Sequence, residues 1–245
     1  MCESFRHFLL NAIFKLLRSL IAVSNDQSIP AIDKLFEDLM HPNPRIQEDA
    51  CLQMAENYAS EALPRLLELF EHEDPKVYRG AVKGVGFFGY KAFLPIIELY
   101  GRTKNQTARR CCPKAFVQLF KNFPDQAFPS EVMELLRDSI ADSDMVVVQG
   151  GLMCLGQLGK QQIGGDEAVQ LLINVLKNEN VALVFSATQA LADINHPLVA
   201  SSLKSLMDSS TDPLIKEAAE SGLARHENLV AISKQNKATS CATCL

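Results

Sequence analysis

Apolar and small residues recur along this chain with helical spacing, and the whole pattern recurs every 31 to 39 residues. One set of recurring positions is apolar throughout: Ile46, Val77, Ala108, Val147, Ala182 and Ile215. The set four residues later holds only small side chains: Ala50, Ala81, Cys112, Gly151, Ser186 and Ala219. The set eight residues later is again apolar: Met54, Val85, Phe116, Leu155, Ala190 and Leu223. Because positions i, i+4 and i+8 share one side of an α-helix, the pattern predicts six helices that each bury one side.

Each of these helices follows a turn and an earlier apolar segment. The earlier segments are residues 32–40, 63–70, 93–100, 132–140, 169–176 and 198–207. The turns contain Asn-Pro, Asp-Pro, Ser-Asp or Asn-Glu-Asn, which end one helix and cap the next. Helix–turn–helix units of this length stack into solenoids. The sequence therefore predicts an all-α fold, an α-solenoid of about six HEAT-like helix pairs forming a right-handed superhelix.

The two ends of the chain differ from this repeat. Residues 1–27 are predicted to be an amphipathic capping helix and a linker, because Asn11, Lys15 and Arg18 fall on one side of an otherwise apolar helix. An interfacial membrane helix is the alternative for this segment. No transmembrane segment is predicted, since no run of 18 uncharged apolar residues occurs. Residues 28–228 form the predicted repeat domain, and residues 229–245 a flexible tail.

Composition narrows the class of protein. The 245 residues are 47% hydrophobic and 22% charged, with a net charge of −5, which excludes disordered and collagen-like chains. The seven cysteines are odd in number and four fall in apolar helical patterns, so we expect a reducing, cytoplasmic compartment rather than a disulfide framework. Cys241 and Cys244 stand alone in the predicted tail, and no metal site is predicted.

Positive charge is concentrated in the second and third units. Residues 76–121 hold ten basic residues and one acid, Glu98. The helix columns beside the buried side place several of these cations on the predicted concave groove: Arg79, Lys83, Arg110 and Lys114. An excess of this kind predicts an anion site, and a merely solvated face is the alternative. Cys111 lies beside Arg109 and Arg110, whose charges would favour its thiolate.

Several segments resemble a known family. They are Tyr-Arg-Gly-Ala-Val-Lys-Gly-Val-Gly at 78–86, Asn-Phe-Pro-Asp-x-x-Phe-Pro at 122–129 and Gly-Leu-Met-Cys-Leu-Gly-Gln-Leu-Gly at 151–159. These are similar to segments of the phycobilisome-lyase HEAT-like repeat family, the E/F-type bilin lyases. The likeness covers roughly residues 35–226.

The resemblance implies a bilin lyase or lyase-chaperone, which helps to attach a linear tetrapyrrole to a cysteine of a phycobiliprotein, with phycoerythrin the expected acceptor. Bilin is then a substrate, with no tightly bound cofactor, and a second HEAT-repeat lyase subunit is an expected partner. The propionates would meet the cationic residues of the groove, while Tyr78 would cover a ring face. Glu48 is the candidate carboxylate that keeps the tetrapyrrole protonated. The expected substrate-binding residues are Tyr78, Arg79, Lys83, Arg109, Arg110 and Lys114.

A non-enzymatic scaffold is the second hypothesis, since HEAT solenoids commonly present a concave surface to proteins. Nucleic-acid binding is not expected, because a basic stripe over many repeats would be needed. The predicted groove column is instead interrupted by Glu48, Gln149, Val184 and Glu217.

Overall fold

The computed structural model describes residues 29–242 and the side chains up to residue 235, and this part of the chain is helical without strands. The first helices of the six pairs are α2 (Ile32–Leu39), α4 (Ala59–Glu68), α6 (Phe93–Arg102), α8 (Glu131–Ile140), α10 (Gly165–Val175) and α12 (Pro197–Ser209). The second helices are α3 (Pro44–Asn57), α5 (Pro75–Val85), α7 (Gln106–Asn122), α9 (Met145–Leu158), α11 (Val181–Ala192) and α13 (Pro213–Ala242). Two short 3₁₀ segments, Leu69–Glu71 and Gly89–Ala92, complete the elements.

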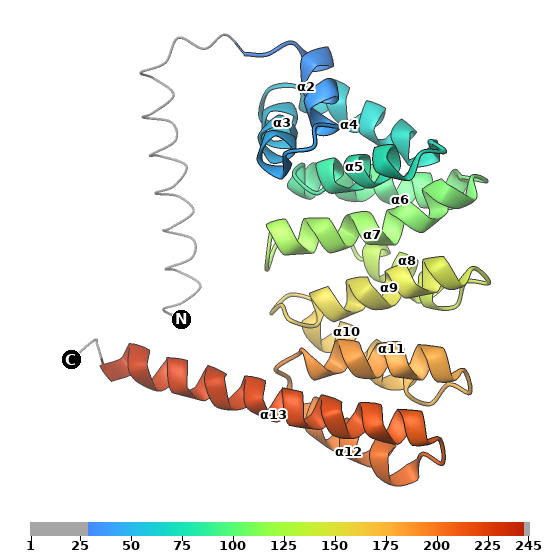
Figure 1. Ribbon diagram of the computed structural model, residues 1–245, viewed down its shortest axis with the longest axis vertical. Helices are drawn as coiled ribbons and strands as arrows, with labels where there is room; N and C mark the ends of the chain where they lie inside the picture. The colour runs from blue at the N-terminus through green and yellow to red at the C-terminus, as the bar shows by residue number, and fades with distance from the viewer. Residues whose placement is uncertain (1–28, 243–245) are drawn as a thin grey trace.

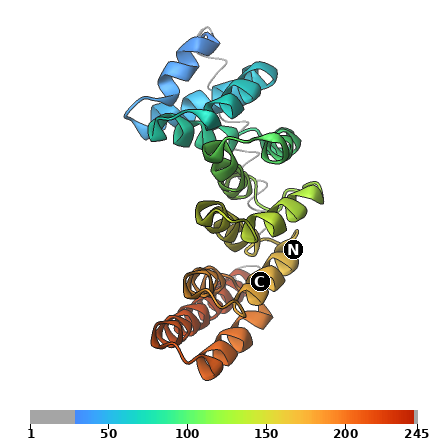
Figure 2. The ribbon, with the colours of Figure 1, turned by 90° about the vertical axis from the view of Figure 1, so that its right-hand side faces the viewer.

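The helix pairs stack into the predicted α-solenoid. Figure 1 shows α5, α7, α9, α11 and α13 side by side along one face. The view turned by 90° shows the first helices as a second row beside them (Figure 2). Each second helix from α5 onward packs closely on the next, whereas α3 meets α5 at fewer positions. The core therefore lies between the two rows and continues from one pair to the next.

The turn before each second helix sets the register of that helix. A side-chain oxygen of the N-cap residue accepts a hydrogen bond from a backbone N–H of the first turn, which satisfies a donor that has no partner inside the helix. The N-cap residues are Asn43, Asp74, Asn105, Asp144, Asn180 and Asp212. Two residues earlier, another side chain accepts from the N–H of the N-cap residue itself: His41, His72, Thr103, Asp142, Asn178 and Ser210. All six turns thus share the same two side-chain-to-backbone hydrogen bonds.

The buried columns confirm the predicted register in five units and correct it in the fifth. Seven residues after the N-cap, the side chain is small and buried in all six helices: Ala50, Ala81, Cys112, Gly151, Ala187 and Ala219. The prediction placed Ser186 in this column, one residue too early. Because Asn180 caps α11, the column falls on Ala187, while Ala182 is exposed and Ser186 is half-buried. Val184, predicted to face the groove, is therefore buried, and so is Thr188 one turn later.

Small residues are required where α9 meets its neighbours. A Cβ at Gly151 would lie 2.9 Å from Ser139 Cβ on α8, and one at Gly150 would lie 2.9 Å from Pro113 Cγ on α7. Contacts this short force displacement of packed groups. The two glycines consequently allow α9 to approach both its own first helix and the preceding second helix.

The long connection between the third and fourth units is fixed by aromatic contacts and hydrogen bonds. The rings of Phe120 and Phe128 meet edge to face at a centroid distance of 5.2 Å, and Phe128 also packs beside Phe93. Asp125, at φ 58°, accepts a hydrogen bond through Oδ1 from the backbone N–H of Gln162. The Gln161 side chain accepts from Asp125 N–H and donates to the Phe120 carbonyl. The Asn-Phe-Pro-Asp segment at 122–125, one of those that carry the family resemblance, therefore connects the loops of two adjacent units.

The predicted boundary at residue 228 is not a break in the structure, because α13 continues to Ala242. Residues 229–242 contain neither glycine nor proline, so nothing in them stops the helix. The capping helix predicted in residues 1–27 lies outside the described residues. Within the described part of the chain, no helix is both long and apolar enough to cross a membrane.

Candidate functional site on the second-helix face

The outward side of the second helices is defined by the residues five and nine positions after each N-cap. We call these residues in α5, α7 and α9 the second-helix strip: Arg79, Lys83, Arg110, Lys114, Gln149 and Met153. Arg79 is exposed on α5, and Lys83 and Lys114 are half-buried. No ion pair to Arg79, Lys83 or Lys114 occurs among the described residues. Three cations of the predicted site thus remain available to an anion.

The other two cations of the predicted site are engaged by acids of the next unit. Arg109 pairs with Asp142 at 2.8 Å, and its guanidinium lies 4.2 Å from the centre of the Tyr100 ring. Arg110 pairs with Asp144 at 2.6 Å. Although partial burial opposes it, the hydrogen bonds from Arg110 and from the Val146 N–H hold the pKa of the Asp144 carboxyl below its usual value. Arg109 and Arg110 therefore fasten α7 to the turn before α9.

Asp142 and Asp144 lay just beyond the basic window, so the charge count for residues 76–121 missed them. Their separations from Arg109 and Arg110 are 33 and 34 residues, about one repeat. The same spacing joins Arg65 to Asp33 and Arg225 to Asp193 across neighbouring units. Looking for an acid one repeat away from each basic residue would have identified these pairs from sequence.

Tyr78 and Glu48 lie at the edge of the strip. Tyr78 is half-buried against the core, and the Arg79 guanidinium is 6.0 Å from the centre of its ring. Glu48 is exposed on α3, and among the described residues no ion pair connects it to Arg79. Lys83 reaches toward α3, with Nζ 3.5 Å from Oε1 of Gln47. The structure therefore brings Arg79, Lys83 and Lys114 onto one face, with Glu48 on the adjoining helix.

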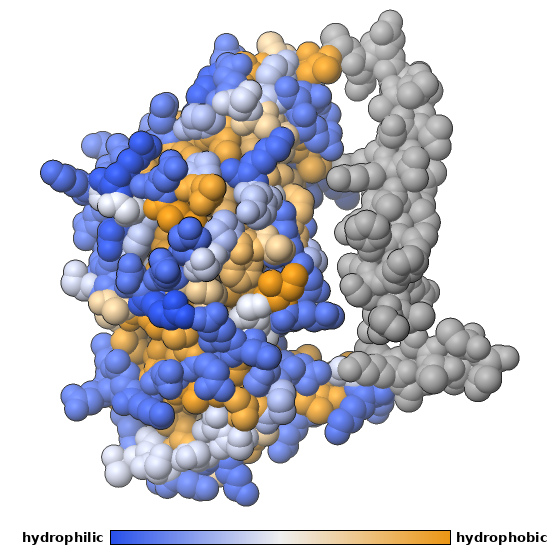
Figure 3. Space-filling view, turned by 180° about the vertical axis from the view of Figure 1, so that it is seen from behind, coloured by the Kyte–Doolittle hydropathy of each residue, from blue (hydrophilic) through white to orange (hydrophobic). Residues whose placement is uncertain are grey.

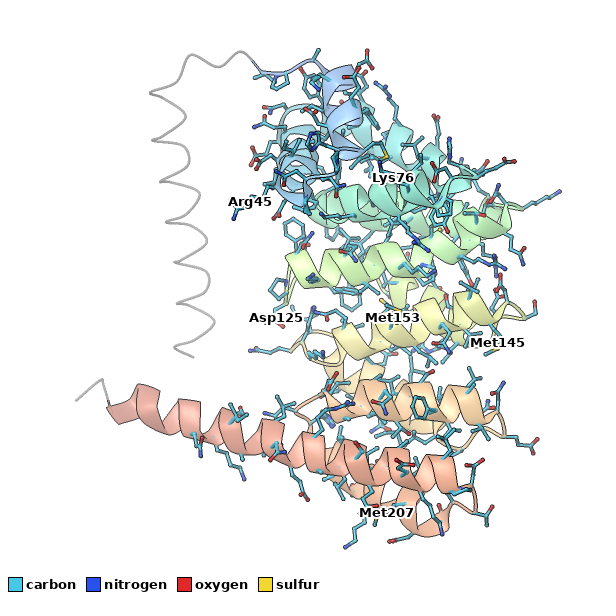
Figure 4. The ribbon with its side chains drawn as sticks, viewed as in Figure 1. Arg45, Lys76, Asp125, Met145, Met153 and Met207 are labelled. Atoms are coloured by element: carbon cyan, nitrogen blue, oxygen red, sulfur yellow. The ribbon has the colours of Figure 1, made fainter. Side chains whose placement is uncertain are left out.

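The strip changes from cationic to apolar between α7 and α9. A Cβ at Gly150 would lie 3.5 Å from Lys114 Cγ, so the stem of Lys114 lies across α9 at this glycine. Met153, three residues further on α9, has 56% of its surface exposed. Figure 4 shows Met153 in the middle of α9 and Met145 at its start. Met153 was not among the site residues predicted from the sequence.

Cysteine chemistry is not accessible on this face. Cys51, Cys111, Cys112 and Cys154 are all buried. Burial raises the pKa of Cys51 to about 12 and that of Cys111 to about 11. The expectation that neighbouring arginines favour a Cys111 thiolate is wrong, because burial outweighs the opposing charge of Lys114 and raises the pKa of this thiol. Among the described side chains, no group of three His, Cys, Asp or Glu residues is placed to hold a metal ion.

The hollows of the surface lie on the opposite face. One, of about 360 Å³, is bounded by α4 and α6 and includes Leu67, Glu68 and Glu98. A second of similar volume adjoins it near Phe36 and Met40. Figure 3 shows this first-helix face, with apolar side chains among the hydrophilic ones. Arg79, Lys83 and Lys114 line neither of these two hollows, so the second-helix strip is a separate surface.

Comparisons with known proteins agree with the repeat. The family model for HEAT repeats matches residues 32–111 and 134–224. "Bilin biosynthesis protein CpeZ" of Synechococcus sp. (strain WH8020) is 43% identical over 182 residues, which are 74% of this chain and 98% of that protein. "Uncharacterized phycocyanin operon protein Z" of Pseudanabaena tenuis (strain PCC 7409) is 30% identical over 84% of this chain and 100% of its own length. A designed armadillo repeat protein superposes with a TM-score of 0.41 at 14% identity, covering 80% of this chain and 100% of its own.

Proposed function

Because the chain belongs to the CpeZ-like family of HEAT-repeat bilin lyases, we propose that it assists the covalent attachment of a linear tetrapyrrole to a cysteine of a phycobiliprotein. The single observation that carries this proposal is the 43% identity over 98% of a protein named for bilin biosynthesis. A bilin-related role follows from the family. The finer assignments, attachment itself and phycoerythrin as the acceptor, are our proposal.

The charges on the second-helix strip support a dicarboxylate substrate. A bilin carries two propionates, and we assign their recognition to Arg79, Lys83 and Lys114, the cations without acidic partners among the described residues. Arg79 can pair with a carboxylate through two N–H groups, and the lysines act as point charges. Arg109 and Arg110 hold α7 and α9 in place beneath the substrate. Glu48 remains the proposed carboxylate that keeps the tetrapyrrole protonated.

The chemistry that we propose needs orientation rather than a nucleophile of this chain. The sulfur of the acceptor's cysteine bonds to the ethylidene carbon of ring A, and the thiol proton ends on the adjacent ring carbon. Nothing is oxidised or reduced, and no leaving group departs. Holding the bilin on a fixed surface beside the thiolate supplies the effective concentration that this addition needs. The burial of Cys51, Cys111, Cys112 and Cys154 supports the view that the reacting thiol is that of the acceptor rather than one of these four.

A chaperone role toward the acceptor is favoured by a second observation. The helix starts of the last three units expose apolar side chains where the first units carry proline, polar or basic residues: Met145, Val146, Val181 and Leu214. Exposed apolar residues repeated along one edge are typical of a protein-binding surface. We propose that the phycobiliprotein subunit contacts this edge, with a second HEAT-repeat lyase subunit as a further partner.

Attachment in the presence of purified components tests the function. Bilin and a phycobiliprotein subunit are incubated with and without this protein, and covalent colour is measured on a denaturing gel. We expect faster or more selective labelling of one cysteine when the protein is present, as judged by mass spectrometry of the labelled peptides. Identical rate and cysteine selectivity with and without it, also after addition of a candidate partner subunit, would contradict the proposal.

A further inference from the structure

We propose that Lys114 and Met153 form the two poles of one bilin subsite, in which the Lys114 ammonium pairs with a propionate and the Met153 thioether packs on the conjugated plane. This inference rests on the proposed function, and it goes further by naming the ligand contact on α9. It also fixes the direction of the substrate. The carboxylates lie over α5 and α7, and an end ring extends over α9.

Two of the residues one turn away from Met153 are glycines, whereas the other two, Gln149 and Gln157, carry half-buried side chains. Gly150 and Gly156 precede and follow Met153 by three residues on the same side of α9. Both glycines are covered by adjacent helices: a Cβ at Gly150 would contact Pro113 and Lys114 of α7, and one at Gly156 would lie 3.1 Å from Ala190 Cβ of α11. Met153 therefore projects from α9 between two places where this helix closely approaches α7 and α11, so a ligand lying on Met153 would also reach these neighbouring helices.

The exposure of Met153 is costly without a ligand. Each square ångström of apolar surface removed from water contributes about 25 cal/mol, and more than half of the surface of this side chain faces solvent. A thioether also makes favourable contacts with π systems, and its three rotatable bonds allow it to follow the twist of an extended tetrapyrrole. These properties favour a conjugated ligand over a purely ionic one.

The position of Lys114 connects the apolar contact to the charge. Its stem crosses α9 at Gly150, one helical turn from Met153. The nearest outward polar residue of α9, Gln149, is already engaged, since its amide nitrogen donates to Ser186 Oγ at 3.1 Å. Lys114 is thus the cation beside Met153, and a ligand with both a carboxylate and a planar apolar body complements the pair.

Methionine oxidation gives a direct readout that does not depend on attachment. The full-length protein is treated briefly with hydrogen peroxide, with and without a saturating free bilin, and sulfoxide is measured for each methionine by peptide mass spectrometry. We expect the bilin to slow oxidation of Met153 by about fivefold or more. Met145, which is also exposed on α9, and Met207 on α12 serve as internal controls and should oxidise at unchanged rates (Figure 4).

A matched pair of variants gives the second measurement. Met153→Gln should weaken bilin binding, followed by absorption, by about fivefold, the equivalent of about 1 kcal/mol. Leu198→Gln, at an exposed apolar position of α12, should bind like the wild type. Wild-type protein that binds bilin without protecting Met153, or with equal affinity in the Met153→Gln variant, overturns this subsite and leaves the proposed function standing. Absence of any bilin binding, also with acceptor and partner subunit present, overturns both.

Discussion

The second and third helix pairs present cations on the same face where the fourth pair presents an apolar side chain. Arg79, Lys83 and Lys114 occupy the outward columns of α5 and α7, whereas Met153 occupies the equivalent position on α9. The turns that precede these helices are alike, since an aspartate or asparagine caps each helix and a second side chain bonds to that cap. The two regions therefore share one scaffold and differ in the chemistry that they present.

This difference separates the residues that hold the fold from those that bind. The capping turns and the small buried column occur in all six pairs, so they belong to the repeat. The outward columns vary from pair to pair and make few contacts with the core. Substitutions there can therefore determine which ligand binds. The largest effects on stability are expected in the shared column, and the largest effects on binding in the outward ones.

Overpacking of the shared column should damage both regions alike. Ala81→Leu in α5 and Gly151→Leu in α9 each place a large side chain at a fully enclosed helix contact, and even a Cβ at Gly151 would lie 2.9 Å from Ser139 Cβ. We expect each variant to lower the free energy of unfolding by about 1–3 kcal/mol. Urea unfolding followed by circular dichroism measures this. A variant as stable as the wild type would show that its helix is not packed as described.

Charge reversal on the cationic region should abolish selectivity for acidic ligands without unfolding the protein. The combined Arg79→Glu and Lys114→Glu variant should bind bilin about tenfold or more weakly, a loss of about 1.4 kcal/mol. Each surface substitution should change stability by no more than about 0.5 kcal/mol. Lys104→Glu, in an exposed turn, is the control and should bind nearly as the wild type does. Equal binding by the double variant would mean that this basic region is only a solvated face.

Removing the charge partner of Arg110 should make the region on α5 and α7 more cationic and so increase its difference from α9. Asp144→Asn keeps an N-cap side chain but removes the charge partner of Arg110. We expect a loss of at most about 1 kcal/mol in stability, since the pair is partly exposed, and tighter bilin binding by the freed guanidinium. Isothermal titration of bilin into both proteins measures the second effect. Weaker or unchanged binding by the variant would show that the freed Arg110 guanidinium does not contact the bilin.

The pH dependence of the same variant has a definite sign. The Asp144 carboxyl has a folded-state pKa below its ordinary value of 3.8. Its charge therefore stabilises the fold above about pH 4, and this contribution is lost as the pH falls through the lowered pKa. The difference in stability between wild type and Asp144→Asn should be present at neutral pH and vanish in acid. A difference that grows as the pH falls would contradict the pairing.

The smallest effect is expected from the buried thiols. Cys111→Ala should leave bilin attachment to the acceptor unchanged, because the Cys111 side chain is 2% exposed and burial raises the pKa of its thiol to about 11. Denaturing gels of the attachment reaction measure this. Loss of attachment by a folded Cys111→Ala variant would instead indicate a covalent relay through this chain.

Much of the fold followed from the sequence because the repeat is local. The spacing of apolar and small residues gave six helix pairs, and caps such as Asn43 and Asp74 marked the start of the second helices. The error in α11 arose from aligning by apolar character, since Ala182 and Leu183 fit a buried column equally well. The cap resolves this ambiguity, because Asn180 fixes the buried position three residues later.

The site was harder to predict because some of its charged residues are paired with residues of the next unit. In the sequence, Arg109 and Arg110 resembled unpaired cations. In the structure, the turn of the next unit places Asp142 and Asp144 against them. Met153 resembled an ordinary outward residue, and only the contacts of Gly150 and Gly156 show how closely α7 and α11 approach α9 on either side of it. Both features depend on contacts between units, and the periodicity within one helix gives no information about such contacts.

The central claim, that the second-helix strip recognises a bilin by its carboxylates, is tested most directly by comparing a bilin with its dimethyl ester. The ester keeps the conjugated body and removes both negative charges. Titration of wild-type protein, followed by absorption, should give an affinity about tenfold or more lower for the ester, the equivalent of at least about 1.4 kcal/mol. Equal affinities for the free acid and the ester would contradict the claim.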